Sequence, residues 1–244
     1  MRTPDPAEAR QFIDSSRFVW FHKMELAPGV ITPGVSDIGW LAGAAGLPQD
    51  LSGTSVLDIG TANGGAAFMA ERRGASDVVA VDIYPPSWFG MDRLIELLDS
   101  RVRFVQASLY ELPEVLGRRF DLVLCWGVLY HLRHPLLGLD ALRRLTGARC
   151  SLETAVADRE VDPGQPVVRF YRRDELSGDG SNWWAPTTTA LADMLASCGF
   201  EVGRLVPVPP GEPASRAICD LVPAEPEWPA ICYEVPLRGV PLEA

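Results

Sequence analysis

Two carboxylates, each at the end of an apolar run, are the residues whose types and spacing most directly suggest chemistry. Asp58 follows Val56-Leu57 and leads into the run of mostly small residues Gly60-Thr61-Ala62-Asn63-Gly64. Asp82 ends the next apolar run about two dozen residues later. Small residues let a backbone approach a ligand closely, and a carboxylate placed like Asp82 can accept hydrogen bonds from both ribose hydroxyls. The pattern predicts a turn that binds a nucleoside.

This turn is unsuited to a nicotinamide dinucleotide, because Asp58 lies two residues before Gly60 and would repel a pyrophosphate. S-adenosylmethionine has no phosphate, and a carboxylate stabilises its cationic sulfonium and ammonium groups. The segment from Asp58 to Gly64 resembles the first motif of class I methyltransferases, with Ala62 in place of the usual middle glycine. The resemblance implies S-adenosylmethionine as the cofactor.

The end of the next strand resembles the adenine site of the same family. It reads Phe104-Val105-Gln106-Ala107-Ser108, and Ser108 stands where an aspartate is common. The candidate cofactor-binding residues are Asp58, Gly60, Thr61, Ala62, Asn63, Gly64, Asp82, Ile83, Ser108, Leu109 and Trp126.

Three further segments narrow the resemblance. Gly127-Val128-Leu129-Tyr130-His131, Leu152-Glu153-Thr154 and residues 182–200 are similar to the wobble-uridine tRNA carboxymethyltransferase family, and Val30-Ile31-Thr32-Pro33-Gly34 extends the similarity over most of the chain. Three departures count against that tRNA activity: the family's long N-terminal extension is missing, the charge is acidic, and a lysine for the donor's carboxylate is replaced near Gly39. We therefore expect ordinary S-adenosylmethionine as the donor and a small molecule as the acceptor.

Residues just beyond the strand that ends near Cys125 are the catalytic candidates. Tyr130 and His131 are expected to face the crevice near the methyl donor. Histidine is the natural base if the acceptor is a hydroxyl, since its unperturbed pKa is about 6.5. His131 is the first candidate, His22 on the N-terminal lid is the second, and Tyr130 would orient donor or acceptor. Each also has a structural reading, namely a backbone hydrogen bond or ordinary packing.

The acceptor is expected to meet side chains from two lid-like segments, residues 17–34 and 156–185, which fit no regular element. Long loops in compact domains are often functional lids. Glu153 could bind an acceptor amine or hold a lid arginine. The candidate substrate-binding residues are Trp20, Lys23, Glu153, Tyr171, Arg172, Trp183 and Trp184. Aromatic residues also form ordinary core, which is the alternative for each.

Composition limits the partners. The net charge of −10 over 244 residues disfavours nucleic acid. The five cysteines are scattered with no CxxC pair, which favours a reduced, cytoplasmic protein. Neither a signal peptide nor a stretch of roughly 20 apolar residues is present, so we expect no membrane span. No ligand spacing indicates a metal.

Alternating apolar runs and helical stretches predict one doubly wound α/β domain. Strands are expected over 55–59, 78–81, 102–105, 122–125 and 150–152, with helices over 65–73, 91–98, 109–116 and 135–145 between them. A helix over 187–198 ends at Gly199 and precedes a hairpin of strands 200–206 and 216–221. The expected sheet is Rossmann-like, mostly parallel and seven-stranded, with its last strand antiparallel.

We divide the chain into an N-terminal lid with helices (1–52), a methyltransferase core (53–222) with an insertion near 156–185, and a Pro-rich tail (223–244). The expected activity is methyl transfer to an oxygen or nitrogen of a small molecule, in specialised metabolism such as natural product biosynthesis, by a monomer or homodimer. The alternatives are tRNA wobble-uridine modification and a catalytically silent S-adenosylmethionine-binding module.

Overall fold

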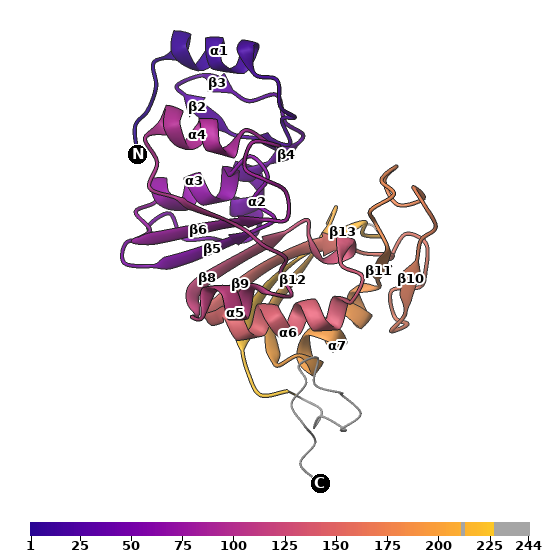
Figure 1. The fold of residues 1–244 in the computed structure, drawn as a ribbon. Coiled ribbons are helices and arrows are strands. Elements are labelled where there is room, and N and C mark those ends of the chain that lie inside the picture. The colour runs from indigo at the N-terminus through magenta and orange to yellow at the C-terminus, as the bar shows by residue number, and fades with distance from the viewer. Residues whose placement is uncertain (211–212, 227–244) are drawn as a thin grey trace.

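A seven-stranded sheet forms the centre of the protein in the computed structural model, which describes residues 1–210 and 213–226 (Figure 1). The strand order is β12-β13-β9-β8-β5-β6-β7, and only β13 runs antiparallel to the others. The strands are β5 (Ser55–Ile59), β6 (Asp77–Asp82), β7 (Arg103–Gln106), β8 (Phe120–Trp126), β9 (Thr146–Ala155), β12 (Phe200–Val208) and β13 (Arg216–Pro223). The predicted doubly wound sheet with its last strand antiparallel is confirmed.

Helices cover both faces of the sheet, so the central strands are buried on both sides. One face carries α2 (Ile38–Ala44), α3 (Gly65–Arg72) and α4 (Met91–Leu98), and the other carries α5 (Leu112–Leu116), α6 (Pro135–Leu145) and α7 (Thr188–Ser197) (Figure 1). A hydrophobic cluster lies on each face, with Phe68 fully buried in one and Phe120 in the other. This arrangement explains why the strands read as continuous apolar runs.

Two local signals set where helices begin and end. Pro135 opens α6, where its missing N–H costs nothing, and α7 is followed by Gly199 with φ +81°. The helix expected over 109–116 instead begins at Leu112, because Pro113 favours the first turn. The strand expected over 150–152 extends to Thr146–Ala155, because it pairs with β8 on one side and β13 on the other.

Two segments lie over the carboxyl ends of the parallel strands, and we call them the N-terminal cover (residues 17–37) and the insertion cover (residues 156–186). The expectation that residues 17–34 and 156–185 hold no regular element is wrong. Their strands have only two or three residues, too short for periodicity to reveal them. They are β1 (His22–Lys23) with β4 (Ser36–Asp37), β2 (Glu25–Ala27) with β3 (Val30–Ile31), and β10 (Val168–Phe170) with β11 (Trp184–Pro186).

An additional helix, α1 (Pro6–Ser15), packs over β2 and β3 at the top of the molecule as drawn in Figure 1. Asp5 caps it by accepting hydrogen bonds from Ala7 N and Glu8 N. No helix among residues 1–210 and 213–226 is long and apolar enough to cross a membrane. The predicted Pro-rich tail lies outside the described residues from 227 onward.

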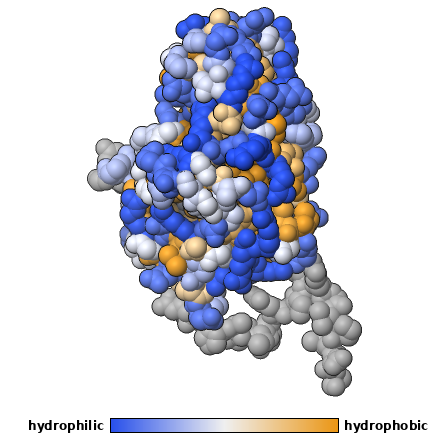
Figure 2. All heavy atoms as spheres, turned by 90° about the vertical axis from the view of Figure 1, so that its left-hand side faces the viewer, coloured by the Kyte–Doolittle hydropathy of each residue, from blue (hydrophilic) through white to orange (hydrophobic). Residues whose placement is uncertain are grey.

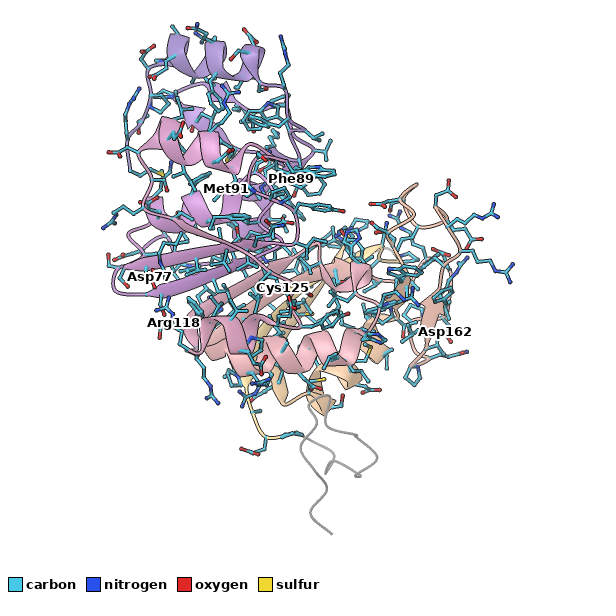
Figure 3. All side chains as sticks on the ribbon, viewed as in Figure 1. Asp77, Phe89, Met91, Arg118, Cys125 and Asp162 are labelled. Atoms are coloured by element: carbon cyan, nitrogen blue, oxygen red, sulfur yellow. The ribbon has the colours of Figure 1, made fainter. Side chains whose placement is uncertain are left out.

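The two ends of the strands differ in chemistry. At the amino ends, Arg118 pairs with Asp77 at the start of β6, whereas Cys125 lies buried toward the carboxyl end of β8 (Figure 3). The face of the molecule turned toward the viewer in Figure 2 is mostly hydrophilic, with small hydrophobic patches between polar side chains.

Candidate active site

Two cavities meet at the carboxyl ends of β5 and β8, where parallel sheets commonly bind ligands. The large cavity has a volume of about 560 Å³ and the small cavity about 370 Å³. They share four wall residues, namely Phe21, Gly60, Trp126 and Gly127. Gly60 and Gly127 have φ of +72° and +74°, and this left-handed backbone favours glycine. The shared wall therefore joins the turn after β5 to the turn after β8.

The large cavity is lined by residues that follow β5, β6, β7 and β8. Asp82 lies in its wall, where one carboxylate oxygen accepts from Ala62 N at 3.0 Å and the other from Tyr84 N at 3.1 Å. A carboxylate offers about four acceptor sites, so Asp82 can accept further hydrogen bonds from a diol. Tyr84 and Trp88 stack at 4.7 Å between ring centroids and are partly exposed at the same cavity.

The predicted cofactor residues divide into those that line a cavity and those that do not. Those that line one are Asp58, Gly60, Ala62, Asp82, Ile83, Ser108, Leu109 and Trp126. Thr61, Asn63 and Gly64 line neither. Gly64 has a packing reason, since a Cβ there would come within 2.3 Å of the Met91 sulfur. Thr61 donates its hydroxyl to Asp58 at 2.6 Å.

Asp58 reaches the small cavity from the end of β5 but is only 4% exposed. Its Oδ2 accepts from Thr61 Oγ1 and from Ala67 N at 3.1 Å. Burial raises the pKa of Asp58 to about 6, and nearby Asp82 adds to the rise. A cationic ligand group beside Asp58 would favour its ionised form, whereas an anion would not.

Asn63 has a different role from the predicted cofactor contact. Its side chain is fully buried, and its Oδ1 accepts from Phe21 N at 2.7 Å and His22 N at 2.9 Å. Its Nδ2 donates to Val19 O at 2.9 Å and Phe89 O at 2.7 Å. These four bonds use the full capacity of the amide. Asn63 therefore ties the N-terminal cover to the turn after β5.

His22 is held against α3 by its side chain. It is 6% exposed, lines the small cavity, and accepts from Gly65 N through Nδ1 at 3.1 Å. Burial lowers its pKa to about 4, so the ring is neutral near pH 7. A Cβ on Gly34 would lie 2.2 Å from the His22 backbone, so close packing also fixes this segment from the other side.

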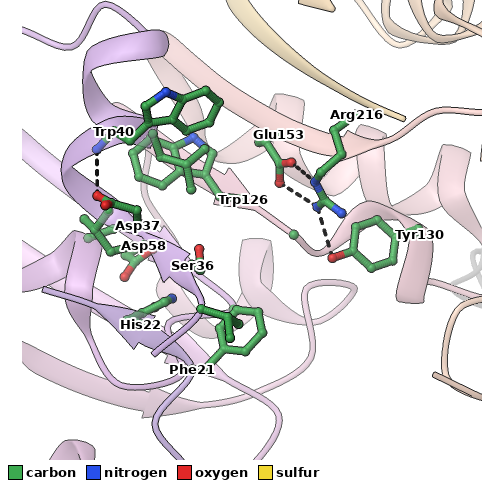
Figure 4. Close-up of a pocket in the computed structure, with 16 residues that line it drawn as sticks. Phe21, His22, Ser36, Asp37, Trp40, Asp58, Trp126, Tyr130, Glu153 and Arg216 are labelled. Carbon is green, nitrogen blue, oxygen red and sulfur yellow. Dashed lines mark hydrogen bonds and ion pairs between the residues drawn. The ribbon is translucent and has the colours of Figure 1, made fainter. Parts of the chain in front are cut away.

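An ion pair faces His22 across the small cavity (Figure 4). Arg216, from the start of β13, pairs with Glu153 from β9 and donates to the Tyr130 hydroxyl at 3.2 Å. Strand register explains the pair, since Ile218 lies opposite Glu153 and Arg216 is two residues away on the same face. Burial raises the pKa of Tyr130, so its hydroxyl keeps its proton and can donate it to a ligand.

His131 lies in the 3-10 turn η1 (Leu129–His131), because β8 ends at Trp126 and the left-handed Gly127 redirects the chain. It lines the large cavity together with Asp179 and Ser181 of the insertion cover. The structure thus places Tyr130 at the small cavity and His131 at the large one.

Most predicted acceptor contacts lie away from both cavities. Glu153 lines the small cavity, but Trp20, Lys23, Tyr171, Arg172, Trp183 and Trp184 line neither. Lys23 pairs with Asp37 at 3.0 Å, and Tyr171 donates to Glu160 at 3.0 Å. Trp184 donates to Leu132 O at 2.7 Å. The Lys23 and Tyr171 contacts lie within one cover each, whereas Trp184 attaches the insertion cover to the chain after β8.

Sequence reasoning missed several lining residues. They are Phe21, Asp37, Trp40, Tyr84, Trp88, Phe89, Asp179, Ser181 and Arg216. One had a local signal, since Asp37 caps α2 by accepting from Trp40 N at 2.9 Å. Among the described residues, no cluster of three histidine, cysteine, aspartate or glutamate side chains could hold a metal ion.

Comparison with known proteins adds a family and several relatives. Residues 56–147 match the family described as "Methyltransferase domain". The tRNA U34 carboxymethyltransferase of Ectopseudomonas mendocina is 35% identical over 181 residues, which cover 71% of this chain and 52% of that protein. The enzyme of the same name from Dichelobacter nodosus is 33% identical over 158 residues, covering 62% and 47%. The chain spans about half the length of these relatives.

Solved structures share the fold at low identity. The N-terminal domain of EvdMO1 with S-adenosylhomocysteine bound has a TM-score of 0.63 at 19% identity, covering 90% of this chain and 94% of that one. The Burkholderia thailandensis 1,6-didemethyltoxoflavin-N1-methyltransferase has a TM-score of 0.55 at 23% identity, covering 77% and 76%. These likenesses support the arrangement of the sheet and its helices.

Proposed function

We propose that this chain, whose residues 56–147 match a methyltransferase domain, transfers a methyl group from S-adenosylmethionine to an oxygen or nitrogen atom of a small-molecule acceptor. The observation that carries this proposal is the pair of cavities joined at Phe21, Gly60, Trp126 and Gly127. The large cavity suits the nucleoside of the cofactor, and the small cavity offers a place for the acceptor beside it.

The residues of the large cavity suit this cofactor and not a dinucleotide. Asp82 can present carboxylate oxygens to a ribose, and among the described residues no lysine or arginine lines the cavity to neutralise a pyrophosphate. Asp58 adds a carboxylate beside the shared wall. S-adenosylmethionine supplies a methyl group on a cationic sulfur, and acidic residues next to this wall favour a cation.

The small cavity supports a small acceptor. Its volume of about 370 Å³ lies at the lower end of the range for small-molecule sites. Phe21, Trp40 and Trp126 give it apolar walls, while His22, Tyr130 and the Glu153–Arg216 pair give it polar groups. Holding an acceptor in line with a methyl group can contribute roughly 7–11 kcal/mol, so positioning is the main task of these residues.

Calorimetric titration tests the cofactor first. S-adenosylmethionine is titrated into the wild-type protein and into Asp82→Ala, with NADH in parallel. We expect binding that Asp82→Ala weakens by about tenfold or more, which is about 1.4 kcal/mol, and no binding of NADH. Absence of S-adenosylmethionine binding to folded protein would remove the basis of the proposal.

A panel of candidate acceptors tests the second part of the proposal, which is methyl transfer to a small molecule. Purified protein, S-adenosylmethionine and hydroxyl- or amine-bearing aromatic compounds are incubated, and S-adenosylhomocysteine is measured by mass spectrometry. We expect transfer to at least one acceptor. Cofactor binding without transfer to any compound would favour a silent binding module.

The second candidate function is modification of tRNA, favoured by the names of the curated relatives. The net charge of −10 opposes it, since phosphate binding depends on basic residues. Binding of tRNA that weakens steeply with salt, together with transfer to tRNA but to no small molecule, would establish this function instead.

A further inference from the structure

The two histidines at the cavities are held by hydrogen-bond partners that differ in kind. A neutral imidazole has one nitrogen that donates and one that accepts, and the partner of one nitrogen decides the state of the other. Nδ1 of His22 faces a backbone N–H, whereas Nδ1 of His131 faces Ser181 of the insertion cover. The nitrogen that carries the proton can therefore be assigned separately for each ring.

His131 has its proton on Nδ1. That nitrogen lies 3.3 Å from the carbonyl oxygen of Ser181, which can only accept, and 2.9 Å from the Ser181 hydroxyl. The single hydroxyl proton of Ser181 is donated to Asp179 Oδ1 at 2.7 Å, and Ser181 N donates to the same oxygen at 2.8 Å. These bonds lower the pKa of Asp179, so it is a carboxylate that only accepts. His131 therefore donates a hydrogen bond to Ser181, and Ser181 donates one to Asp179. This arrangement leaves a lone pair on Nε2 of His131.

His22 has the opposite arrangement. Gly65 N can only donate, so Nδ1 of His22 must accept and its proton must lie on Nε2. None of the described residues accepts a hydrogen bond from this Nε2. His22 thus presents a donor at the small cavity and has no free lone pair with which to take a proton.

We infer that His131 is the general base of the proposed transfer and that Ser181 and Asp179 are its positioning residues. This inference rests on the proposed function. The acceptor forms a bond to the methyl carbon, the carbon–sulfur bond breaks with its electron pair on sulfur, and the acceptor's proton moves to Nε2 of His131. His131 lines the large cavity, and its ring packs on that of Tyr130, which lines the small cavity, so the base lies on the side of the large cavity nearest the acceptor's cavity.

The groups around His131 fit this assignment. Its ring packs on Tyr130 at 4.4 Å between centroids, and its pKa is lowered by burial and Arg216 but raised by Ser181 and Asp179. Arg216 is itself paired with Glu153. The net lowering keeps His131 neutral near pH 7, so its lone pair is free to accept a proton.

Nuclear magnetic resonance of protein labelled with ¹⁵N at histidine tests the assignment without an acceptor. The chain has only His22, His131 and His134, so His131→Gln and His134→Gln assign the spectrum. We expect the Nδ1–H form for His131 and the Nε2–H form for His22 in the same sample. An Nε2–H form for His131 in the wild-type protein would overturn the inference.

Variants of the insertion cover distinguish positioning of the His131 ring from a general effect on the structure of the cover. Ser181→Ala and Asp179→Asn should shift the His131 signals and its titration midpoint, whereas the matched control Ser177→Ala, in the same cover, should leave both unchanged. If the His131 titration and tautomer are the same in Ser181→Ala as in the wild type, Ser181 does not position the ring and the inference fails.

Kinetics follow once an acceptor is known. His131→Gln should lower kcat by about 10²-fold or more and remove the acidic limb of the pH profile. An unchanged kcat would overturn the role of His131. Failure of the proposed function is distinguishable, because S-adenosylmethionine would then not bind while the histidine signals kept their expected forms.

Discussion

The N-terminal cover and the insertion cover lie over the same edge of the sheet but are attached to different parts of it. Asn63 and Gly65, in the turn after β5 and at the start of α3, hold the N-terminal cover. The insertion cover is held by the chain that follows β8, where Trp183 N donates to Tyr130 O at 2.9 Å and Trp184 donates to Leu132 O. One cover is fixed to the turn that is proposed to meet the cofactor, the other to the turn that carries His131.

Their contributions to the cavities differ accordingly. The N-terminal cover supplies Phe21 to both cavities and His22, Ser36 and Asp37 to the small one. The insertion cover supplies only Asp179 and Ser181, both to the large cavity. Changes in the N-terminal cover should therefore reach both cavities through Phe21, whereas changes in the insertion cover away from Asp179 and Ser181 should leave cofactor affinity largely intact.

Removal of the Asn63 amide should have the largest effect. Asn63→Ala leaves two backbone N–H groups and two carbonyls without partners, and a buried unsatisfied group costs about 1–3 kcal/mol. We expect a loss of about 3–4 kcal/mol in the free energy of unfolding, measured in urea, and faster proteolysis within residues 17–37. A loss below about 1 kcal/mol would contradict the proposed attachment.

The same substitution in each cover gives a direct comparison. A Cβ at Gly34 would meet the His22 backbone at 2.2 Å, whereas a Cβ at Gly180 meets only Arg173 O at 3.9 Å. Gly34→Ala should cost about 2–3 kcal/mol of stability and weaken S-adenosylmethionine binding, while Gly180→Ala should change stability by no more than about 0.5 kcal/mol. Equal effects in thermal unfolding would show that the covers are packed alike.

The pH dependence of cofactor binding tests the role of Asp58, which lines the small cavity together with residues of the N-terminal cover. A cation favours ionised Asp58, whose pKa is raised to about 6, so binding below that pH must release a proton. Affinity should fall by up to about tenfold per pH unit as the pH decreases below 6, by calorimetry. Asp58→Asn should remove this dependence, and a dependence that persists there would assign it to another group.

The smallest effect is expected in the insertion cover. Trp184→Phe removes the hydrogen bond to Leu132 O and should cost about 1 kcal/mol of stability without changing S-adenosylmethionine affinity. Trp183→Phe is the control, because its ring packs under Arg133 and its side chain has no comparable buried bond. A large loss of cofactor affinity in Trp184→Phe would contradict the expectation that this part of the insertion cover does not affect cofactor binding.

The sheet could be predicted because its signals are local. The apolar runs predicted β5 and β6, and the carboxylates Asp58 and Asp82 predicted the edge of the sheet at which the two cavities lie. The attachment of the covers could not be predicted, because the partners of Asn63 are backbone groups of residues 19–22 and 89, which carry no signature in sequence.

The polar groups of the small cavity depend on strand register in the same way. Arg216 and Glu153 are far apart in sequence and meet only because β13 pairs with β9 in one register. Likewise, Asp179 and Ser181 carry no recognisable signal in the sequence, and the fold of the insertion cover brings them to His131. The aromatic residues were predicted to bind substrate from their residue type alone. Residue type does not distinguish an aromatic side chain that lines a cavity from one that packs within a cover.

Cys125 lies at the end of β8, next to the wall that would face an electrophilic methyl group. A thiolate there would be a competing nucleophile, but the thiol is 1% exposed and burial raises its pKa to about 12. Cys150, Cys198 and Cys219 are buried as well. The Cys125 thiol is thus kept protonated and shielded, which disfavours its alkylation by a methyl donor bound at this wall.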